Sequence, residues 1–442
     1  MRKLISMLLV SVTISIINSP CGIANQDTEK ALQTTNEQYK TDEQLDQLIS
    51  KVKGTITAIR GLEFREPIKR GIKNRDELKE YLRNVIKSEM PDEKIYASQK
   101  ALVKLGFIPH GLDLKNFLIE LYTEQVVGFY DWRVGTLYLI REVPIEMEEM
   151  VLAHEMTHAL QDLHFNLKSL PLERKDNDDL VMATQALIEG EALLVMIDYM
   201  LKPMGIESSS LPDMGTLLQE ATGFGDGGVF SNAPIWVQKN LLFPYLEGFV
   251  FVQEVKKKDN WKGLDKCYTV LPQSTEQILH PEKYLTEKDL PTIVSLPRLS
   301  EYLGDGWVFL DENVLGEFNV DLLFHQYLTQ DNYNSKFANG WDGDLLQVYE
   351  NKDSKKVFIA WLSTWDTDND AKEFFDGYNS IVQKKYDEKL VSSAPNFFLW
   401  ETQEDMVYLE LKGHDVLILE GVPLRSLNQV ITHVWQGCKK EG

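Results

Sequence analysis

The amino-acid sequence predicts an α+β protein, in which a mainly helical part with a small sheet is followed by a smaller α+β domain. Three observations favour this class. Apolar residues recur at helical spacing over 43–105, short β-rich runs occur at 126–130 and 136–140, and strand and helix patterns mix beyond Pro297. The chain has 442 residues, more than one hydrophobic core usually organises, so more than one domain is expected.

Composition and charge narrow the class of partner. Hydrophobic residues make up 43% and charged residues 26% of the chain, which are values typical of a globular protein. Lys and Arg total 46 against 68 Asp and Glu, which gives a net charge of −22. Because such a chain repels a phosphate backbone, we expect no nucleic-acid partner.

Residues 1–24 predict a signal peptide. Two basic residues precede an apolar stretch at 4–17, and Gly22 and Ala24 supply the small residues that a cleavage site needs. The apolar stretch is short for a membrane span. We therefore expect a protein that is secreted or held in the cell envelope.

The three cysteines bear on the same question. Cys21 offers a lipid anchor, which makes a lipoprotein the alternative and would be the chain's one contact with a membrane, although residues 18–20 fit a lipobox poorly. Cleavage would leave Cys267 and Cys438, which either form one disulfide or stay as two buried thiols. These two residues cannot make a cysteine zinc site.

The elements of the first domain follow in order. Residues 25–42 are polar and predict a linker, and residues 43–105 predict helices. The runs at 126–130 and 136–140 predict a β-hairpin. A helix begins near Pro144, because proline suits a first turn and the carboxylates that follow favour the positive end of the helix dipole. Further helices are expected at about 180–201, 234–256 and 275–279.

The second domain is predicted from a change of composition across residues 291–297. Its strands are expected at 346–349, 357–362, 407–411 and 416–419, and its helices near 370–386 and 424–436. We therefore divide the chain into one domain at 43–299 and an α+β domain at 300–442.

The sharpest chemical signal is the run His154-Glu155-Met156-Thr157-His158. On a helix, positions four apart differ by about 40° around the axis, so both imidazoles project from one face and can bind one metal ion. Glu155 lies about 100° from His154, where it can reach a metal-bound water without binding the metal. This is the geometry of the zinc-protease motif.

A catalytic zinc ion needs a third protein ligand, and the candidates are His164, Glu189 and Glu191. His164 sits where a metzincin places its third histidine, but Gln161 replaces the glycine that would turn the chain there. If the helix continues instead, His164 points about 120° away from His158.

Glu189 is favoured over Glu191. Glu191 belongs with Thr184 and Asp198 to a polar stripe that repeats every seven residues, which predicts a side facing solvent. Glu189 lies about 160° away from Glu191 among apolar residues, where an unpaired carboxylate is costly to bury. A metal would compensate for that burial, and a hydrogen bond to Gln185 or to backbone is the alternative.

These residues resemble the gluzincin-type HExxH zinc metallopeptidases, in which a second helix supplies a glutamate ligand. The wider pattern, with 124–130 before the motif and 274–281 after it, is similar to a group of largely uncharacterised secreted or lipoprotein bacterial proteins. The resemblance covers about residues 55–300 and implies a zincin-like core and peptide hydrolysis. Leu193 stands where the thermolysin pattern has an aspartate, so the groups that support the ligands must differ.

The expected function is that of a secreted or envelope-associated zinc metallopeptidase acting on a peptide or protein substrate. His154, His158 and Glu189 would hold one Zn²⁺ per chain, and Glu155 would act as general base on the zinc-activated water. The alternative is a non-catalytic, zinc-stabilised envelope protein that binds a protein or cell-wall partner. Glu155 favours the enzyme, because a structural zinc site does not need it.

Three further residues or segments are expected to support catalysis. Asp162, four residues after His158, could orient a ligand imidazole, and a surface aspartate on an amphipathic helix is the alternative. The strand at 136–140 precedes the metal helix, where zincins place the edge strand that pairs with an extended substrate, and an ordinary hairpin is the alternative. Gluzincins usually take an oxyanion donor from a histidine or tyrosine downstream of the glutamate ligand.

The resemblance places that donor at His280, which is expected to be catalytic. His280 lies within the 274–281 pattern, and Pro281 biases it away from helical geometry at the end of a helix. Tyr284 and Tyr245 are the substitutes, and a histidine that only caps the helix is the alternative.

Overall fold

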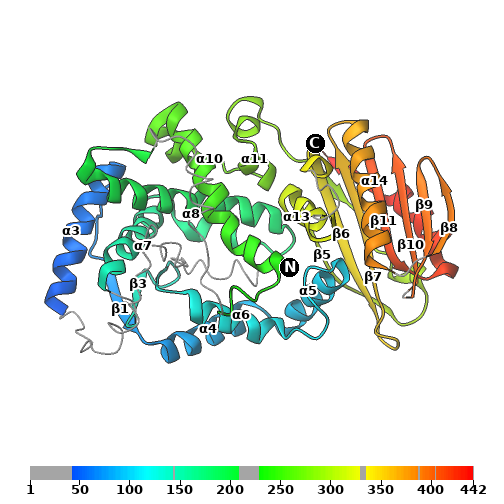
Figure 1. Cartoon of the computed structure of the whole chain (residues 1–442), viewed down its shortest axis with the longest axis horizontal. Coiled ribbons are helices and arrows are strands. Elements are labelled where there is room, and N and C mark those ends of the chain that lie inside the picture. Colours follow the sequence, from blue (N-terminus) through cyan, green and yellow to red (C-terminus); the bar gives the residue numbers. More distant parts are fainter. Residues whose placement is uncertain are drawn as a thin grey trace, which may run out of the picture.

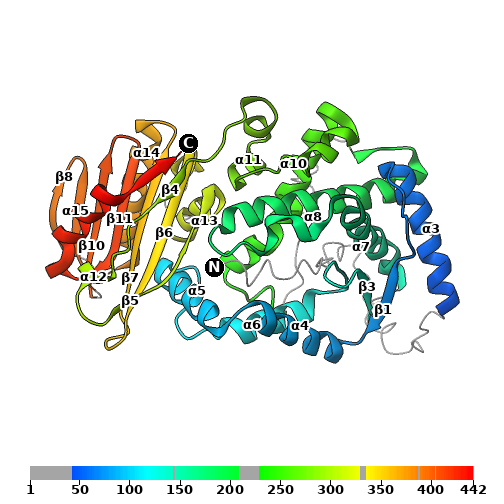
Figure 2. The same cartoon turned by 180° about the vertical axis from the view of Figure 1, so that it is seen from behind.

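The structure is a computed structural model that describes residues 42–142, 145–208, 228–328, 335–386, 389–403 and 405–441. The predicted signal peptide, Cys21 and all but the last residue of the predicted linker lie outside these residues. The protein is a mixed α and β structure, as expected, with the helices of the first part at one end and a large sheet at the other (Figures 1 and 2).

The first part is built mainly from long helices. In chain order its elements are α3 (Asp42–Arg60), β1 (Lys69–Lys73), α4 (Arg75–Glu89), α5 (Asp92–Leu105), α6 (Leu114–Gln125), β2 (Gly128–Asp131), β3 (Thr136–Ile140), α7 (Ile145–Phe165), α8 (Asp178–Leu201), α10 (Ile235–Cys267) and α11 (Thr275–Leu279). The predicted hairpin and the helices near 145, 180, 235 and 275 are therefore confirmed.

The second part forms a sheet with helices on both faces. Its elements are β4 (Ile293–Ser295), α12 (Ser300–Leu303), β5 (Trp307–Asn313), α13 (Gly316–Leu328), β6 (Trp341–Asn351), β7 (Val357–Trp365), α14 (Asp368–Lys385), β8 (Lys389–Ala394), β9 (Phe397–Glu401), β10 (Met406–Lys412), β11 (Asp415–Val422), α15 (Leu427–Gly437) and β12 (Lys439–Glu441). The seven strands pair in the order β5-β6-β7-β11-β10-β9-β8, each antiparallel to its neighbour. A separate two-stranded sheet joins β12 to β4.

The alternation of side chains along each strand explains why helices cover both faces of the sheet. In β7, Trp361 packs with α14 on one face of the sheet, whereas Leu362 packs with α15 on the other. Successive side chains of a strand point to opposite faces, so a run that is apolar at every position needs cover on both sides. Figures 1 and 2 show α14 and α15 on opposite faces of this sheet.

The two parts share one continuous hydrophobic core. The cluster that contains α7, α8 and α10 also contains side chains of α13, α14 and strands β6 and β7. A polar contact also joins the two parts, since the backbone N–H of Asp178 donates to Asn313 at 2.8 Å. The boundary at residues 299 and 300 therefore stays a prediction, because no break in the core marks it.

The small sheet corrects one expectation. The strand at 136–140 is β3, and it lies in the middle of the order β1-β3-β2, parallel to β1 and antiparallel to β2. The prediction that it is an edge strand is wrong, because β1 covers its free side. The β1 sequence Lys-Arg-Gly-Ile-Lys carries too few apolar residues to be recognised as a strand.

Helix α8 lies at the centre of the first part. Every residue from Asp178 to Asp198 is buried. By length and composition the segment Asp178–Met204 could cross a membrane, but its most apolar stretch is 100% buried inside the protein. It is therefore the core helix around which α3, α7, α10 and α11 pack.

The close contact between α8 and α10 leads to a prediction about stability. A Cβ atom added at Gly190 would lie 2.2 Å from the backbone carbon and oxygen of Gly248. Backbone cannot move aside as a flexible side chain can, so Gly190→Ala should lower the free energy of unfolding by about 3 kcal/mol or more. Denaturant titration measures this, with Gly54→Ala in α3 as the control.

Gly54 is an exposed helical glycine with nothing within 4 Å of an added Cβ atom. Alanine there should raise stability by up to about 1 kcal/mol, because it is the better helix former. Equal stability of Gly190→Ala and the unmodified protein would contradict the observed helix contact.

Candidate metal centre

Helices α7 and α8 bring three metal-ligating side chains together. His154 and His158 lie one turn apart on α7 and face Glu189 of α8. The three residues are 1%, 3% and 4% exposed. Such burial is costly for a carboxylate and two rings, and a cation held between them would offset that cost.

The ligand atoms form a nearly regular triangle. His154 Nε2 lies 3.1 Å from Glu189 Oε2 and 3.1 Å from His158 Nε2, and His158 Nε2 lies 3.3 Å from Glu189 Oε2. Ligands about 2.0–2.1 Å from a tetrahedral zinc ion are separated by about 3.3–3.4 Å. The donor set and its spacing could therefore hold one metal ion.

Gln161 fixes the chemical form of the His158 ring. Its Nε2 donates to the carbonyl of Ile188 at 3.0 Å and to Glu191 at 3.1 Å, and both of these groups only accept. Gln161 Oε1 must then face His158 Nδ1, which lies 2.8 Å away and must donate. In the neutral ring this leaves the lone pair of Nε2 directed at the centre of the triangle.

A buried ion-pair network holds Gln161 in turn. Glu191 is 0% exposed and accepts from Arg60 Nε of α3, from Gln161 and from the hydroxyl of Tyr268, the last at 2.5 Å. Arg60 also bonds Asp265 at 2.5 Å. The resulting chain of contacts runs from His158 through Gln161 and Glu191 to Arg60.

This network corrects the expectation for the polar stripe. Thr184, Glu191 and Asp198 do not face solvent, since all three are buried. Glu191 pairs with Arg60, and Asp198 pairs with Lys256 at 2.6 Å. The two carboxylates of this repeat thus face charged partners from α3 and α10, and Thr184 donates to the carbonyl of Leu180 in α8 itself at 2.9 Å.

We expect Gln161→Leu to weaken metal binding by about 10–100-fold, because partners that orient a metal-bound imidazole typically contribute that much. Competition with a chelator of known affinity measures it. His164→Ala is the matched control on the same helix, because His164 bonds only the carbonyl of Glu63 among the contacts observed, at 2.9 Å. Unchanged affinity in Gln161→Leu would show that Gln161 does not position His158.

Burial and charge set the ionisation of the three ligands. Burial lowers the pKa of His154. Burial acts in the same sense on His158, but the charge and hydrogen bond of Glu189, together with the charge of Glu155 and the hydrogen bond with Gln161, outweigh it and raise the pKa of His158 to about 9. Burial would raise the pKa of Glu189, yet His158 and His154 outweigh it and bring this pKa to about 2. Glu189 is therefore a carboxylate at neutral pH, and a metal ion would compete with a proton at His158.

Glu155 and Asp162 occupy different environments on α7. Glu155 is 0% exposed, and its charge acts on His158. Asp162 accepts from the hydroxyl of Tyr130 at 2.9 Å and from the backbone of Leu167 at 3.1 Å. The expected bond from Asp162 to a ligand imidazole is not formed, and Gln161 takes that place.

All but one of the residues considered as further ligands or donors lie outside the triangle. His164 and Glu191 are not members of the group. His280 ends α11, and its Nε2 lies 3.0 Å from Glu317 of α13. The ring of Tyr245 from α10, in contrast, stacks beside His154 with centroids 6.0 Å apart. The catalytic role of His280 stays a prediction, and Tyr245 is the substitute that the structure places at the site.

The disulfide considered for the two cysteines is not formed, since Cys267 and Cys438 are both free.

A second group of acidic side chains, Glu276, Asp289 and Asp366, surrounds the ammonium of Lys283 at 2.6, 2.8 and 2.9 Å. The lysine supplies the cation there.

Comparisons with known proteins match part of the chain. Residues 308–431, which include most of the large sheet and helices α13 and α14, match a domain family described as a Domain of unknown function (DUF8575). None of the curated proteins matches the chain. A crystal structure of a "putative hydrolase with a novel fold" from Chloroflexus aurantiacus is similar with a TM-score of 0.34 and 18% identity, over 65% of this chain and 97% of that chain. The triangle of ligands lies outside the matched domain.

Proposed function

We propose that the protein is a zinc-dependent metallopeptidase with a gluzincin-like site on a zincin-like core, secreted or held in the cell envelope. One observation carries the proposal: two histidines from α7 and a glutamate from α8 direct three ligand atoms at one point, with separations of 3.1–3.3 Å. The carboxylate of the motif, Glu155, is buried and its charge acts on His158, but it does not belong to the ligand group. A structural zinc site does not require such a group.

Each residue of the site has a separate role in the proposed hydrolysis. When bound, a zinc ion polarises the substrate carbonyl and lowers the pKa of a water molecule. Glu155 accepts a proton from the attacking water and passes it to the leaving amine. Gln161 keeps the Nδ1 proton of His158 in place, so that Nε2 serves as a ligand. Tyr245 or His280 donates a hydrogen bond to the developing oxyanion.

One observation favours the rival, a non-catalytic protein stabilised by zinc. The three ligands are at most 4% exposed and Glu155 is 0% exposed, which is the burial typical of a structural site. In that case the metal would stabilise the packing of α7 on α8, and the chain would act by binding a protein or cell-wall partner.

Digestion of an unbiased peptide library separates the two proposals. The purified protein should cleave peptides, lose this activity when a chelator removes the metal, and regain it when zinc is restored. Zinc-loaded, folded protein that cleaves no member of the library would favour the non-catalytic rival.

A further inference from the structure

The first turns of α10 are fixed to α13 of the C-terminal part, beside which they lie in Figure 1. Phe318 of α13 contacts Phe243 of α10, with ring centroids 4.1 Å apart. The next residue, Asn319, accepts from the indole N–H of Trp236 at 3.2 Å. The amide of Asn319 donates to the carbonyl of Leu315 at 2.7 Å, so its oxygen must face the indole. Two consecutive residues of α13 therefore hold the start of α10.

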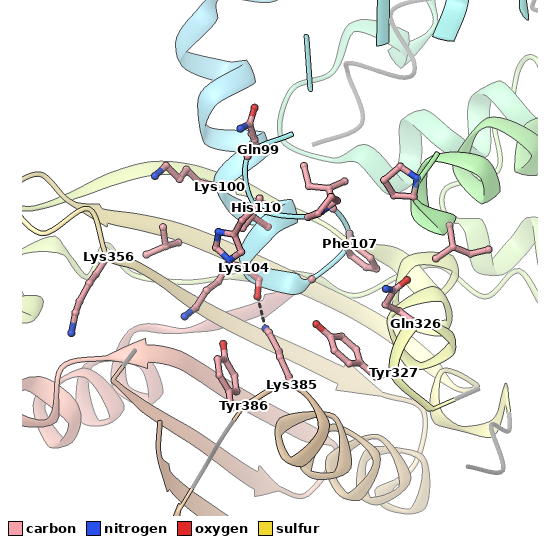
Figure 3. Close-up of a pocket in the computed structure, with 18 of the residues that line it drawn as sticks. Gln99, Lys100, Lys104, Phe107, His110, Gln326, Tyr327, Lys356, Lys385 and Tyr386 are labelled. Carbon is pink, nitrogen blue, oxygen red and sulfur yellow. Dashed lines mark hydrogen bonds between the residues drawn. The ribbon is translucent and has the colours of Figure 1, made fainter. Parts of the chain in front are cut away.

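Phe107, in the loop after α5, supports the same part of α10. Its ring centroid lies 5.7 Å from that of Trp236. Phe107 also lines the pocket drawn in Figure 3, together with Gln326 and Tyr327 near the end of α13. The start of α10 is thus held by contacts with the loop after α5 as well as with α13.

Hydrogen bonds fix Phe318 relative to the metal helix α8. Its backbone N–H donates to the hydroxyl oxygen of Thr275 at 3.2 Å, and this hydroxyl donates to Asp179 of α8 at 2.5 Å. Thr275 and Asp179 are both buried, so water does not compete for these bonds. Phe318 therefore has a defined place relative to the helix that carries Glu189.

The residues after Phe243 reach the metal centre. Tyr245 stacks beside His154, with ring centroids 6.0 Å apart. Positions two apart on a helix differ by about 200° around its axis, so Phe243 faces α13 while Tyr245 faces α7. This turn of α10 is therefore packed between Phe318 on one side and His154 on the other.

Pro244 makes this turn depend on contacts from outside the helix. It lies inside α10, between the two aromatic residues. Proline has no N–H, so it cannot donate to the carbonyl of Asn240 four residues earlier, and its ring disturbs the preceding turn. Helix geometry alone therefore fixes Tyr245 less firmly here. The packing of Phe318 on Phe243 supplies the missing constraint.

We propose that Phe318 is a positioning residue of the site: through Phe243 it holds Tyr245 where the tyrosine can donate to the developing oxyanion. The inference rests on the proposed peptidase function and extends it, because Phe318 belongs to the matched domain at 308–431, which thereby takes part in catalysis. It also favours Tyr245 over His280 as the donor, since Glu317 of the same turn of α13 bonds His280.

Kinetics with a peptide from the library digest test this proposal. Phe318→Ala should lower kcat by about tenfold or more, because a small displacement of a catalytic group is costly in rate. KM should stay within about twofold and the zinc content should not change, since α10 carries no ligand.

A double variant shows whether Phe318 acts through Tyr245. Tyr245→Phe should lower kcat by about 10²–10³-fold, since it removes the donor. Adding Phe318→Ala to Tyr245→Phe should then cause no further loss, because the group that Phe318 positions is already gone. A further loss as large as that in the single variant would contradict the proposal.

Phe398→Ala is the matched control. Phe398 is another half-buried phenylalanine of the C-terminal part, and its ring stacks on Phe375 of α14 with centroids 5.2 Å apart. This variant should keep kcat within about twofold, and an equal loss would contradict a specific role for Phe318. If Phe318→Ala fails to fold, Phe318→Leu, which keeps apolar volume but not the ring contact, should give the same pattern with a loss of about threefold.

Hydrogen exchange tests the packing without requiring activity. The amides of residues 245–249 should exchange about 2–10-fold faster in Phe318→Ala and at the unmodified rate in Phe398→Ala. Unchanged exchange in Phe318→Ala would contradict the proposal even in an active peptidase. Unmodified protein that cleaves no peptide would overturn the proposed function and, with it, the positioning role, and faster exchange would then mark a structural contact only.

Discussion

Glu155→Gln should keep its zinc and lose hydrolysis. Glutamine fills the same buried space but cannot accept a proton, so the rate should fall by about 10²–10⁴-fold, the range typical of general acid–base catalysis. Zinc should stay bound, because Glu155 is not one of the three groups whose ligand atoms converge. Turnover of a peptide found in the library digest and metal content of the same sample measure both effects.

Asp162→Asn is the matched control for this prediction. It replaces a partly buried carboxylate of the same helix, one that bonds Tyr130 and Leu167 and not a ligand ring. This variant should keep both zinc and most of the activity. Glu155→Gln that retains wild-type turnover would remove Glu155 from the mechanism.

Replacing Glu189 and Glu191 should have opposite consequences for the metal. Glu189→Ala should release zinc, because it removes one of three ligands. Glu191→Gln should keep zinc but lower the free energy of unfolding by about 3–5 kcal/mol, because Arg60 loses its main partner while it stays buried. Metal analysis and denaturant titration of both variants measure these outcomes. Zinc retained in Glu189→Ala and lost in Glu191→Gln would transfer the ligand role to Glu191.

Local spacing in the sequence was sufficient to predict the metal helix. Four-residue spacing puts His154 and His158 on one face of any helix, and the structure places their Nε2 atoms 3.1 Å apart. The helix α11 matches its predicted range of 275–279 because a serine caps its start and a proline follows its end. Such features depend only on neighbours in the chain.

Contacts between distant residues could not be predicted in the same way. Arg60, the partner of Glu191, lies 131 residues earlier, so the sequence shows only a polar stripe and not the charge that it meets. The inference that Glu189 is buried agrees with the structure, but the contrast with an exposed Glu191 does not, since both are buried. The sequence shows Gln161 only as the residue that stands in place of a metzincin's glycine. In the structure its two acceptor partners turn its carbonyl oxygen toward His158.

Strands of unusual composition were also missed. β8 is exposed at most positions and β1 is dominated by basic residues, so neither shows the alternation that predicts a strand. Both form because an adjacent strand supplies their backbone hydrogen bonds, β9 for β8 and β3 for β1. The edge-strand prediction is wrong because the sequence does not reveal β1, which pairs with the side of β3 that β2 leaves open.

Metal analysis of the purified protein tests the central claim most directly. The protein should contain one equivalent of zinc per chain, and the double variant His154→Ala with His158→Ala should contain none while the single variant His164→Ala keeps it. Zinc content that is the same in the double variant as in the unmodified protein would contradict the assignment of this triangle as the metal centre.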